Sequence, residues 1–181
     1  MKRTSFALIA GAAIAFLTVP AQGATIIDDW ANIKAPAPPA LQSVTVDPAT
    51  TALLVLDFVK QTCSGPRCTA ALPNVTKVVQ NARAAHVPLI YSFTATSTMA
   101  DTLPPVAPLG GEPAVQAGPD KFLGTDLGQI LTQKGIKTVV VMGMSAQGAV
   151  LYTASHAALT GLTVVVPVVV FVAVSWLPSG S

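Results

Sequence analysis

The sequence predicts an α/β fold in which strands and helices alternate along the chain and the sheet is mainly parallel. The first observation is a set of short apolar runs without polar alternation, which is typical of strands buried on both faces of a sheet. The second is that segments with apolar residues at helical spacing separate these runs. Strands that alternate with helices form parallel sheets through right-handed crossovers, so the two observations together predict the fold class.

Composition bounds the domain count and the partners. The 181 residues suit one domain, and a hydrophobic fraction of 51% is ample for a core. The ten Lys and Arg residues include Lys2 and Arg3, whereas all eight acids lie downstream, so the chain after these two bases is neutral, with eight bases against eight acids. No Lys/Arg cluster is left there, and we expect no nucleic-acid partner.

Residues 1–24 are predicted to be a secretory signal peptide. Lys2 and Arg3 precede an apolar stretch over residues 6–19, and small residues follow, with cleavage expected between Ala21 and Ala24. The alternative is an uncleaved membrane anchor, but the apolar stretch is short for a bilayer span. We therefore expect a periplasmic or secreted protein with no membrane partner after cleavage.

Residues 25–50 are predicted to form a proline-rich N-terminal arm, and residues 51–181 the folded domain. The density of proline over residues 36–39 disfavours a regular helix and favours extended, polyproline-like backbone. We expect this arm to lie over the domain.

The first strand of the domain is predicted over residues 51–57, and its apolar run stops on Asp57. Ligands of open parallel sheets bind beyond the carboxyl ends of the strands, so Asp57 marks the place where chemistry is expected. Two later runs, residues 88–94 and 137–145, are expected to end near the same edge without supplying another acid. The alternative is a structural role, in which Asp57 accepts hydrogen bonds from nearby N–H groups.

The two cysteines, Cys63 and Cys68, lie close together in the sequence. In an exported protein such a pair is typical of a small disulfide loop, here with Gly-Pro between the cysteines. A metal site would need more ligands, and neither of the two histidines is nearby in sequence. A free catalytic thiol would not persist in an oxidising compartment, so a disulfide is the favoured interpretation.

The first helix is predicted over residues 74–85, where apolar residues recur at positions 75, 78, 79, 82 and 85. Residues 63–72 are expected to form a loop, with Pro73 in the first turn of the helix. Residues 95–118, rich in Pro, Gly, Thr and Ser, are expected to be a long irregular segment, and such segments in compact domains are usually functional or mobile.

Two more helices are predicted in the second half of the chain. Residues 125–134 have Thr125 as the N-cap and Gly135 as the stop, and residues 149–160 form the last helix. His156 of that helix could share a face with Ala149, but we interpret it as a surface or packing residue, and His86 as a helix-end residue rather than a ligand. The remaining strands are predicted over residues 89–93, 139–142 and 162–166.

The end of the chain departs from this pattern. Residues 164–176 are almost wholly apolar, yet a membrane span would need a longer run and would not carry Pro167 early. Three interpretations stay open: a long buried strand, a truncation, and a change of reading frame in the gene. We therefore expect the C-terminal part of the fold to be atypical or truncated.

Four motifs make the sequence resemble a known family. They are LLVLD at residues 53–57, FLGTDL at 122–127, GIKTVVVMG at 135–143 and SAQGAVLYTA at 145–154. In this order and spacing they resemble the isochorismatase-like hydrolase (cysteine hydrolase) superfamily. The resemblance implies a Rossmann-like three-layer α/β/α sandwich that cleaves the C–N bonds of small amides or the vinyl ether of isochorismate.

The family's catalytic set is an Asp after the first strand, a Lys from the middle segment and a Cys at the start of a later helix. The resemblance carries these roles onto Asp57, Lys121 and the position of Ala149. Because Ala149 has no nucleophile, the covalent amidase route is excluded, and the mechanism implied is protonation and water attack. The family Lys usually precedes the Phe of the second motif by several residues; Lys121 is adjacent to that Phe, and we prefer it to Lys60.

The resemblance also implies a set of substrate-binding groups. A cis peptide bond is expected between Ser145 and Ala146, and the backbone N–H groups of this turn are expected to face developing negative charge. The partner implied is a small-molecule substrate, with no cofactor and no metal, and a homo-oligomer is left open. The substrate-binding positions are Phe58, Ser145, Ala146, Gln147 and Gly148.

Two functions follow from these residues. The first is an isochorismatase-like hydrolase that acts on a small polar metabolite, with Asp57 as general acid/base. The alternative is a catalytically inactive small-molecule-binding member of the same fold, because Ala149 and the shifted Lys121 are compatible with a pocket that has lost hydrolysis. Formation of product by the purified protein distinguishes the two.

Overall fold

A computed structural model of the protein describes residues 23, 25–37, 40–168 and 174–176 of the chain. The predicted signal peptide, residues 1–24, lies almost wholly outside the described residues. The chain divides into two compact units, residues 1–39 and 40–181. In the first unit, the described residues contain a run of turns and the short 3-10 helix η1 (Trp30–Asn32), and residues 33–37 after it belong to no helix or strand.

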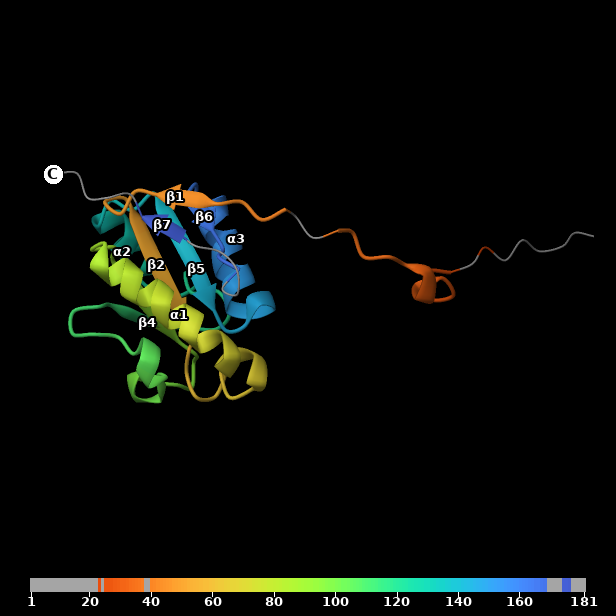
Figure 1. The fold of residues 1–181 in the computed structure, drawn as a ribbon, viewed down its shortest axis with the longest axis horizontal. Coiled ribbons are helices and arrows are strands. Elements are labelled where there is room, and N and C mark those ends of the chain that lie inside the picture. Colours follow the sequence, from red (N-terminus) through yellow and green to blue (C-terminus); the bar gives the residue numbers. More distant parts are fainter. Residues whose placement is uncertain (1–22, 24, 38–39, 169–173, 177–181) are drawn as a thin grey trace, which may run out of the picture. The chain divides into compact units, whose positions relative to one another are not determined.

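The core of the second unit is a five-stranded sheet in which all neighbours are parallel (Figure 1). The predicted first strand, β2 (Thr51–Leu56), is buried at every position and lies in the middle of the sheet. Leu56 at its carboxyl end is aligned with Ser92 on one side and Gly143 on the other. The strand order is β4 (Ala114–Gln116), β3 (Leu89–Phe93), β2, β5 (Thr138–Gly143) and β6 (Thr163–Val165).

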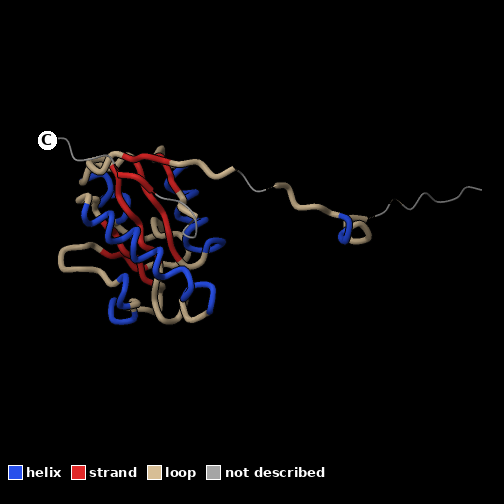
Figure 2. The backbone as a smooth tube through the Cα atoms, in the orientation of Figure 1, coloured by secondary structure: helices blue, strands red, loops and turns tan. Residues whose placement is uncertain are grey.

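Helices cover both faces of this sheet, which confirms the three-layer α/β/α sandwich (Figures 1 and 2). On one face α1 (Pro66–Ala84) buries Val75, Val79 and Ala82 against alternate residues of β2, such as Leu53. On the other face α2 (Leu127–Gln133) and α3 (Leu151–Leu159) pack against the intervening residues of the same strand. Among the described residues, no helix is both long and apolar enough to span a membrane.

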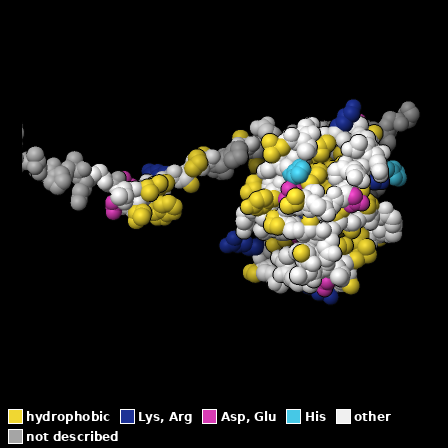
Figure 3. Space-filling model, turned by 180° about the vertical axis from the view of Figure 1, so that it is seen from behind, with side chains coloured by type: hydrophobic (Ala, Val, Ile, Leu, Met, Phe, Trp, Pro, Cys, Tyr) yellow, Lys and Arg dark blue, Asp and Glu magenta, His cyan; other side chains and the backbone are white. Residues whose placement is uncertain are grey.

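Figure 3 shows the charged side chains on one face of the second unit. On the face seen from behind, which α2 and α3 cover, Lys and Arg side chains are scattered singly among hydrophobic and uncharged ones (Figure 3). No cluster of basic side chains is visible on that face.

The start of α1 differs from the prediction. The helix begins at Pro66 and not at residue 74, so most of the expected loop over residues 63–72 is helical and Pro73 lies inside the helix. Pro66 takes the first-turn position that was assigned to Pro73, which suits a residue with no N–H group. The proline inside the helix deprives Thr69 of a hydrogen bond, but Thr69 is exposed, where water can replace the lost bond.

The long segment over residues 95–118 is more ordered than predicted. It contains two 3-10 turns, η2 (Met99–Asp101) and η3 (Pro104–Val106), and then the short edge strand β4. Three residues are too few for a period-two pattern to be recognised in the sequence. A second short pairing was also missed: β1 (Val44–Val46), in the predicted arm, runs parallel to β7 (Val174–Trp176).

The side chain of Arg83, near the end of α1, connects the segment over residues 95–118 to this helix through hydrogen bonds. Its guanidinium donates to both carboxylate oxygens of Glu112, at 2.8 and 2.7 Å. It also donates to the hydroxyl of Tyr91 at 2.9 Å and to the carbonyl of Ala107 at 3.0 Å. Four contacts from one side chain therefore join α1, β3 and the segment before β4.

The last apolar stretch is not one long strand. β6 ends at Val165, and residues 166–168 belong to no strand. Residues 169–173 and 177–181 lie outside the described part of the chain. Of the three interpretations of the tail, the long buried strand is therefore wrong.

Candidate functional site

Asp57 is the first residue after β2, and the backbone turns sharply there. Its φ angle is 54°, in the left-handed region that non-glycine residues rarely adopt. Its N–H still donates to the carbonyl of Ser92 at 3.1 Å, which continues the ladder, while its own carbonyl accepts from the Val59 N–H at 2.8 Å. The turn directs the buried carboxyl group to the edge of the sheet, where strand ends border a cavity.

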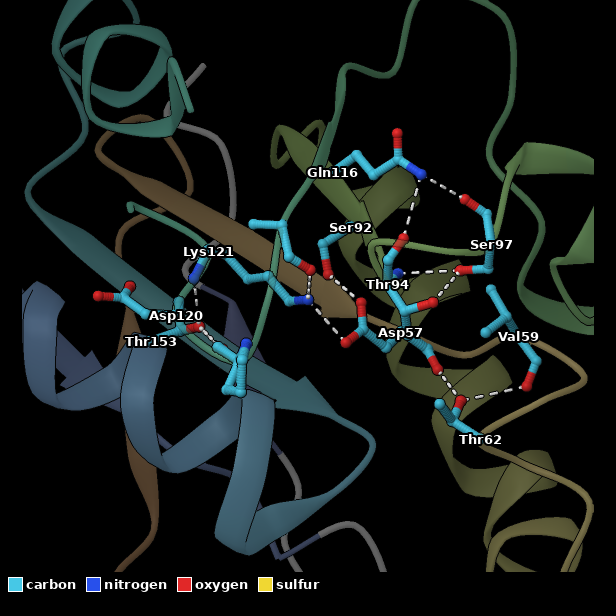
Figure 4. A network of polar contacts seen from close by, with 12 residues as sticks. Asp57, Val59, Thr62, Ser92, Thr94, Ser97, Gln116, Asp120, Lys121 and Thr153 are labelled. Carbon is cyan, nitrogen blue, oxygen red and sulfur yellow. Dashed lines mark hydrogen bonds and ion pairs between the residues drawn. The ribbon is translucent and has the colours of Figure 1, made fainter. Parts of the chain in front are cut away.

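Both oxygens of the Asp57 carboxylate are held by side chains (Figure 4). Oδ2 lies 2.7 Å from the Nζ of Lys121, and Oδ1 accepts a hydrogen bond of 2.7 Å from the Ser92 hydroxyl. The side chains of Asp57 and Lys121 are only 6% and 1% exposed. A buried charge is tolerated when it is paired and hydrogen-bonded, so the two residues depend on each other.

Lys121 reaches Asp57 although it is adjacent to Phe122 in the sequence. The side chain folds back along its own loop, and Nζ also donates to the carbonyl of Ala117 at 3.2 Å. The alternative candidate, Lys60, is exposed, and its backbone N–H is bonded to Asp101. Of these two lysines, the structure places Lys121 and not Lys60 beside Asp57.

A cavity of about 410 Å³ opens beside Asp57. The turn before α3 borders it through Ser145 and Gly148, and the methyl group of Ala149 lies in its wall, where the resemblance puts the family Cys. Three of the predicted substrate-binding residues do not line it: Ala146, Gln147 and Phe58, which packs in the core. The other lining residues are Thr62, Thr94, Ala95, Ala117, Gly118, Pro119 and Met144.

The turn before α3 differs from the prediction in two ways. The cis peptide bond joins Met144 to Ser145 and not Ser145 to Ala146, and Ser145 itself is extended. The turn itself, η4 (Ala146–Val150), is kinked at Gly148, whose backbone angles of −110° and −109° are not helical. The N–H groups of Gly148 and Val150 both donate to the Ser145 carbonyl, at 3.1 and 3.3 Å, so these two donors are used within the turn.

Several polar residues around the site were missed from the sequence. Ser92 could have been found, because it is the polar residue in an otherwise apolar strand that pairs with β2. Thr94 gave no comparable signal, and neither did Gln116, whose side chain donates to the carbonyls of Thr94 and Ser97 at 3.1 and 2.8 Å. These hydrogen bonds position the loop after β3, which includes the cavity-lining residue Thr94 (Figure 4).

The predicted disulfide between Cys63 and Cys68 is present, with the Cα atoms 5.3 Å apart. Cys68 lies in the first turns of α1, and the Cys63 N–H donates to the carbonyl of Val59 at 3.0 Å. The neighbouring Thr62 donates its hydroxyl to the carbonyl of Asp57. The disulfide thus ties the segment that follows Asp57 to the start of α1, and neither sulfur is free.

The histidines lie where the sequence led us to expect them. His86 is an exposed residue at the end of α1, and its N–H donates to the carbonyl of Arg83 at 3.0 Å. His156 on α3 does not line the Asp57 cavity and packs against Asp120 and Phe122. In the described part of the chain, His, Cys, Asp and Glu side chains do not gather in groups of three or more suited to a metal ion.

Comparison with known families gives a direct assignment. The family model described as Isochorismatase domain matches residues 51–168, about two thirds of the chain. The chain belongs to the isochorismatase family. A search of curated proteins returns no match.

Solved structures of isochorismatase-family proteins share the fold. An isochorismatase from Pseudomonas putida is 22% identical, with 68% of this chain and 71% of that chain covered and a TM-score of 0.60. N-carbamoylsarcosine amidase from Thermoplasma acidophilum is 23% identical, with coverages of 64% and 79% and a TM-score of 0.59. A putative isochorismatase from Burkholderia xenovorans is 27% identical, with 64% of each chain covered and a TM-score of 0.58.

Proposed function

We propose that the protein is a hydrolase of the isochorismatase-like class that cleaves a vinyl ether or a C–N bond in a small polar metabolite without a Cys nucleophile. The observation that carries this proposal is the Asp57 carboxylate, held by Lys121 and Ser92 at the edge of a cavity. At about 410 Å³ the cavity is large enough for a metabolite and small for a polymer.

Asp57 would act as general acid and general base, and the order depends on the bond. In a vinyl ether, protonated Asp57 donates its proton to the terminal vinyl carbon, water adds to the carbon beside the ether oxygen and returns a proton to Asp57, and the hemiketal breaks down into a carbonyl compound and an alcohol. In an amide, water loses a proton to the carboxylate as its oxygen bonds to the carbonyl carbon, and the leaving amine takes that proton as the C–N bond breaks. In both cases Asp57 returns to its starting state, and no atom of the protein becomes covalently attached to the substrate.

Lys121 and Ser92 support this role in two ways. They fix the orientation of the carboxylate, which lowers the cost of bringing it to the reacting water. The positive charge of Lys121 also compensates the negative charge of the carboxylate in a buried place. Lys121 itself is buried behind Asp57 and does not line the cavity, so we assign it to Asp57 rather than to the substrate.

The methyl group of Ala149 cannot form a thioester with the substrate, which supports a route without a Cys nucleophile. The same feature supports the second candidate, a binding protein that retains the cavity but does not hydrolyse its ligand. We also propose, from residues 1–24, that the protein acts after export to the periplasm or the medium. The N-terminal residue of protein recovered from these compartments tests that part.

The test of the catalytic proposal is Asp57→Asn, which keeps the size of the side chain and removes its capacity to hold a transferable proton. Turnover of isochorismate or of simple amides should fall at least about 100-fold in the variant. Asp47→Asn, at an exposed acid outside the cavity, serves as the matched control and should leave turnover unchanged. Unaltered turnover in Asp57→Asn would remove Asp57 from the mechanism. Saturable binding of these compounds without product would instead favour the binding protein.

A further inference from the structure

The backbone around Lys121 belongs to the irregular connection between β4 and α2, so something other than secondary structure must hold it. The Lys121 side chain is fully buried and its ammonium group meets Asp57 at 2.7 Å. A small displacement of this backbone would separate the two charges. The contacts of the residues on each side of Lys121 therefore decide how firmly the pair is held.

The first such contact comes from Thr153 on α3. Its buried hydroxyl accepts a hydrogen bond from the Lys121 N–H at 3.2 Å and lies 3.3 Å from the carbonyl of Pro119, to which it donates. One hydroxyl thus fixes two backbone groups of the connection. Figure 4 shows Thr153 directly beside the backbone of this segment.

The second contact comes from His156, three residues further along α3 and on the same side of the helix. Its Nδ1 lies 2.8 Å from Oδ2 of Asp120, the residue before Lys121. Its ring stacks on Phe122, the residue after Lys121, with the ring centroids 4.5 Å apart and an angle of 10° between the planes. Asp120 is held in turn by the Phe122 N–H at 3.0 Å. One imidazole ring therefore contacts both neighbours of Lys121.

We propose that His156 is a positioning residue that, together with Thr153, holds Lys121 against Asp57. His156 does not line the Asp57 cavity, so it acts through Asp120 and Phe122 and not on the substrate. The Asp120 carboxylate accepts a hydrogen bond from Nδ1, so this nitrogen carries the proton. The expected effect of His156 on turnover rests on the proposed function. Its effect on the placement of the Lys121 ammonium group does not, because that placement can be measured without any substrate.

The test compares His156→Ala with His156→Asn and with His86→Ala. Asparagine keeps a short donor toward Asp120, whereas alanine removes both the donor and the ring. His86→Ala removes the other histidine, which is exposed at the end of α1. The readout is the NMR signal of the Lys121 ammonium group in protein with labelled lysine, assigned by its absence from Lys121→Met.

In His156→Ala, hydrogen exchange of this ammonium group should become about tenfold faster, because the contact that shields it is loosened. His156→Asn should recover much of the slow exchange, and His86→Ala should leave it unchanged. Where the parent shows turnover, His156→Ala should lower kcat more than it alters KM. A folded His156→Ala with unchanged exchange overturns the inference.

One further outcome separates this inference from the proposed function. Faster exchange in His156→Ala, with no turnover by the parent on any substrate, upholds the role of His156 and counts against hydrolysis. If His156→Ala does not fold, Asp120→Asn replaces it, because it keeps the shape and weakens the same contact. Unchanged exchange in folded Asp120→Asn then counts against the inference.

Discussion

Two pairs of oppositely charged side chains join distant parts of this domain, and they differ in what surrounds them. Asp57 and Lys121 meet at 2.7 Å at the carboxyl end of β2, beside a cavity. Arg83 and Glu112 also meet at 2.7 Å, but both partners are more exposed, at 23% and 16%. The distance between nitrogen and oxygen alone therefore does not distinguish a functional site from a structural ion pair.

The environment of each pair distinguishes them. Arg83 contacts both oxygens of Glu112, the hydroxyl of Tyr91 and the carbonyl of Ala107, so its donors are directed at the protein itself. Burial tends to raise the pKa of Glu112, but hydrogen bonds from Arg83 and from the Leu109 N–H outweigh this and leave that pKa below its usual value. Burial raises the pKa of the Tyr91 hydroxyl, which therefore stays protonated. We interpret this network as structural.

The largest effect is expected from breaking the buried pair with Lys121→Met. The Asp57 carboxylate would lose its compensating charge in a place with little access to water, at a cost of about 3–5 kcal/mol. Urea unfolding measures the loss of stability. Lys60→Met, at an exposed lysine, is the control and should change stability by less than about 0.5 kcal/mol. Similar small changes in both variants would mean that the Asp57 pair is not energetically coupled.

Breaking the second pair with Arg83→Leu should cost less, about 1–3 kcal/mol, because water can reach the groups that lose their partner. Any turnover at the Asp57 cavity should stay within about twofold of the parent, since Arg83 does not line that cavity. Unfolding curves and kinetic assays on the same preparation test both parts. A large loss of turnover in a stably folded Arg83→Leu variant would contradict the interpretation of the Arg83–Glu112 pair as purely structural.

Ala149→Cys sharpens the comparison by adding a reactive group to the cavity beside Asp57. The new thiol should be the only free one, because Cys63 and Cys68 are bonded to each other. Its alkylation by iodoacetamide should slow about tenfold when Asp57→Asn is added, if Asp57 takes the thiol proton. Equal rates in the single and double variants would show that the carboxylate does not reach position 149.

The smallest effect is a pH dependence of stability that comes from the second pair. The pKa of Glu112 is lowered in the folded protein, so its contribution is fully present above the ordinary pKa of a glutamate and is lost as the pH falls through the lowered value. Glu112→Gln should remove this part of the pH dependence. Thermal unfolding of both proteins between neutral pH and the acid range measures the difference, and parallel curves would contradict the expectation.

Much of the fold follows from the sequence because the central strands are buried on both faces. The apolar runs around residues 51–57 and 137–145 locate β2 and β5 to within a residue or two. The beginning of α1 could not be predicted, because its first turns contain the disulfide and are mostly exposed, so they lack a regular apolar stripe. Short pairings such as β4 depend on tertiary contacts and leave no local pattern.

In the candidate site, too, some residues could be predicted from the sequence and others depend on tertiary contacts. Asp57 was recognisable because it ends a buried strand. The partner hydroxyl of Ser92 was recognisable in principle, since a polar residue in an apolar strand needs a buried contact. The contacts of Thr153 and His156 with the connection after β4 were not, because they join residues more than 30 positions apart without any periodic pattern.

The loop from Ala117 to Lys121 has a consequence for how relatives are recognised. The ammonium group arrives beside Asp57 from a residue adjacent to Phe122, because the side chain doubles back toward the carbonyl of Ala117. A search for relatives with the same pair should therefore look for a lysine nitrogen near the aspartate in three dimensions, and not for a lysine at a fixed spacing in the sequence.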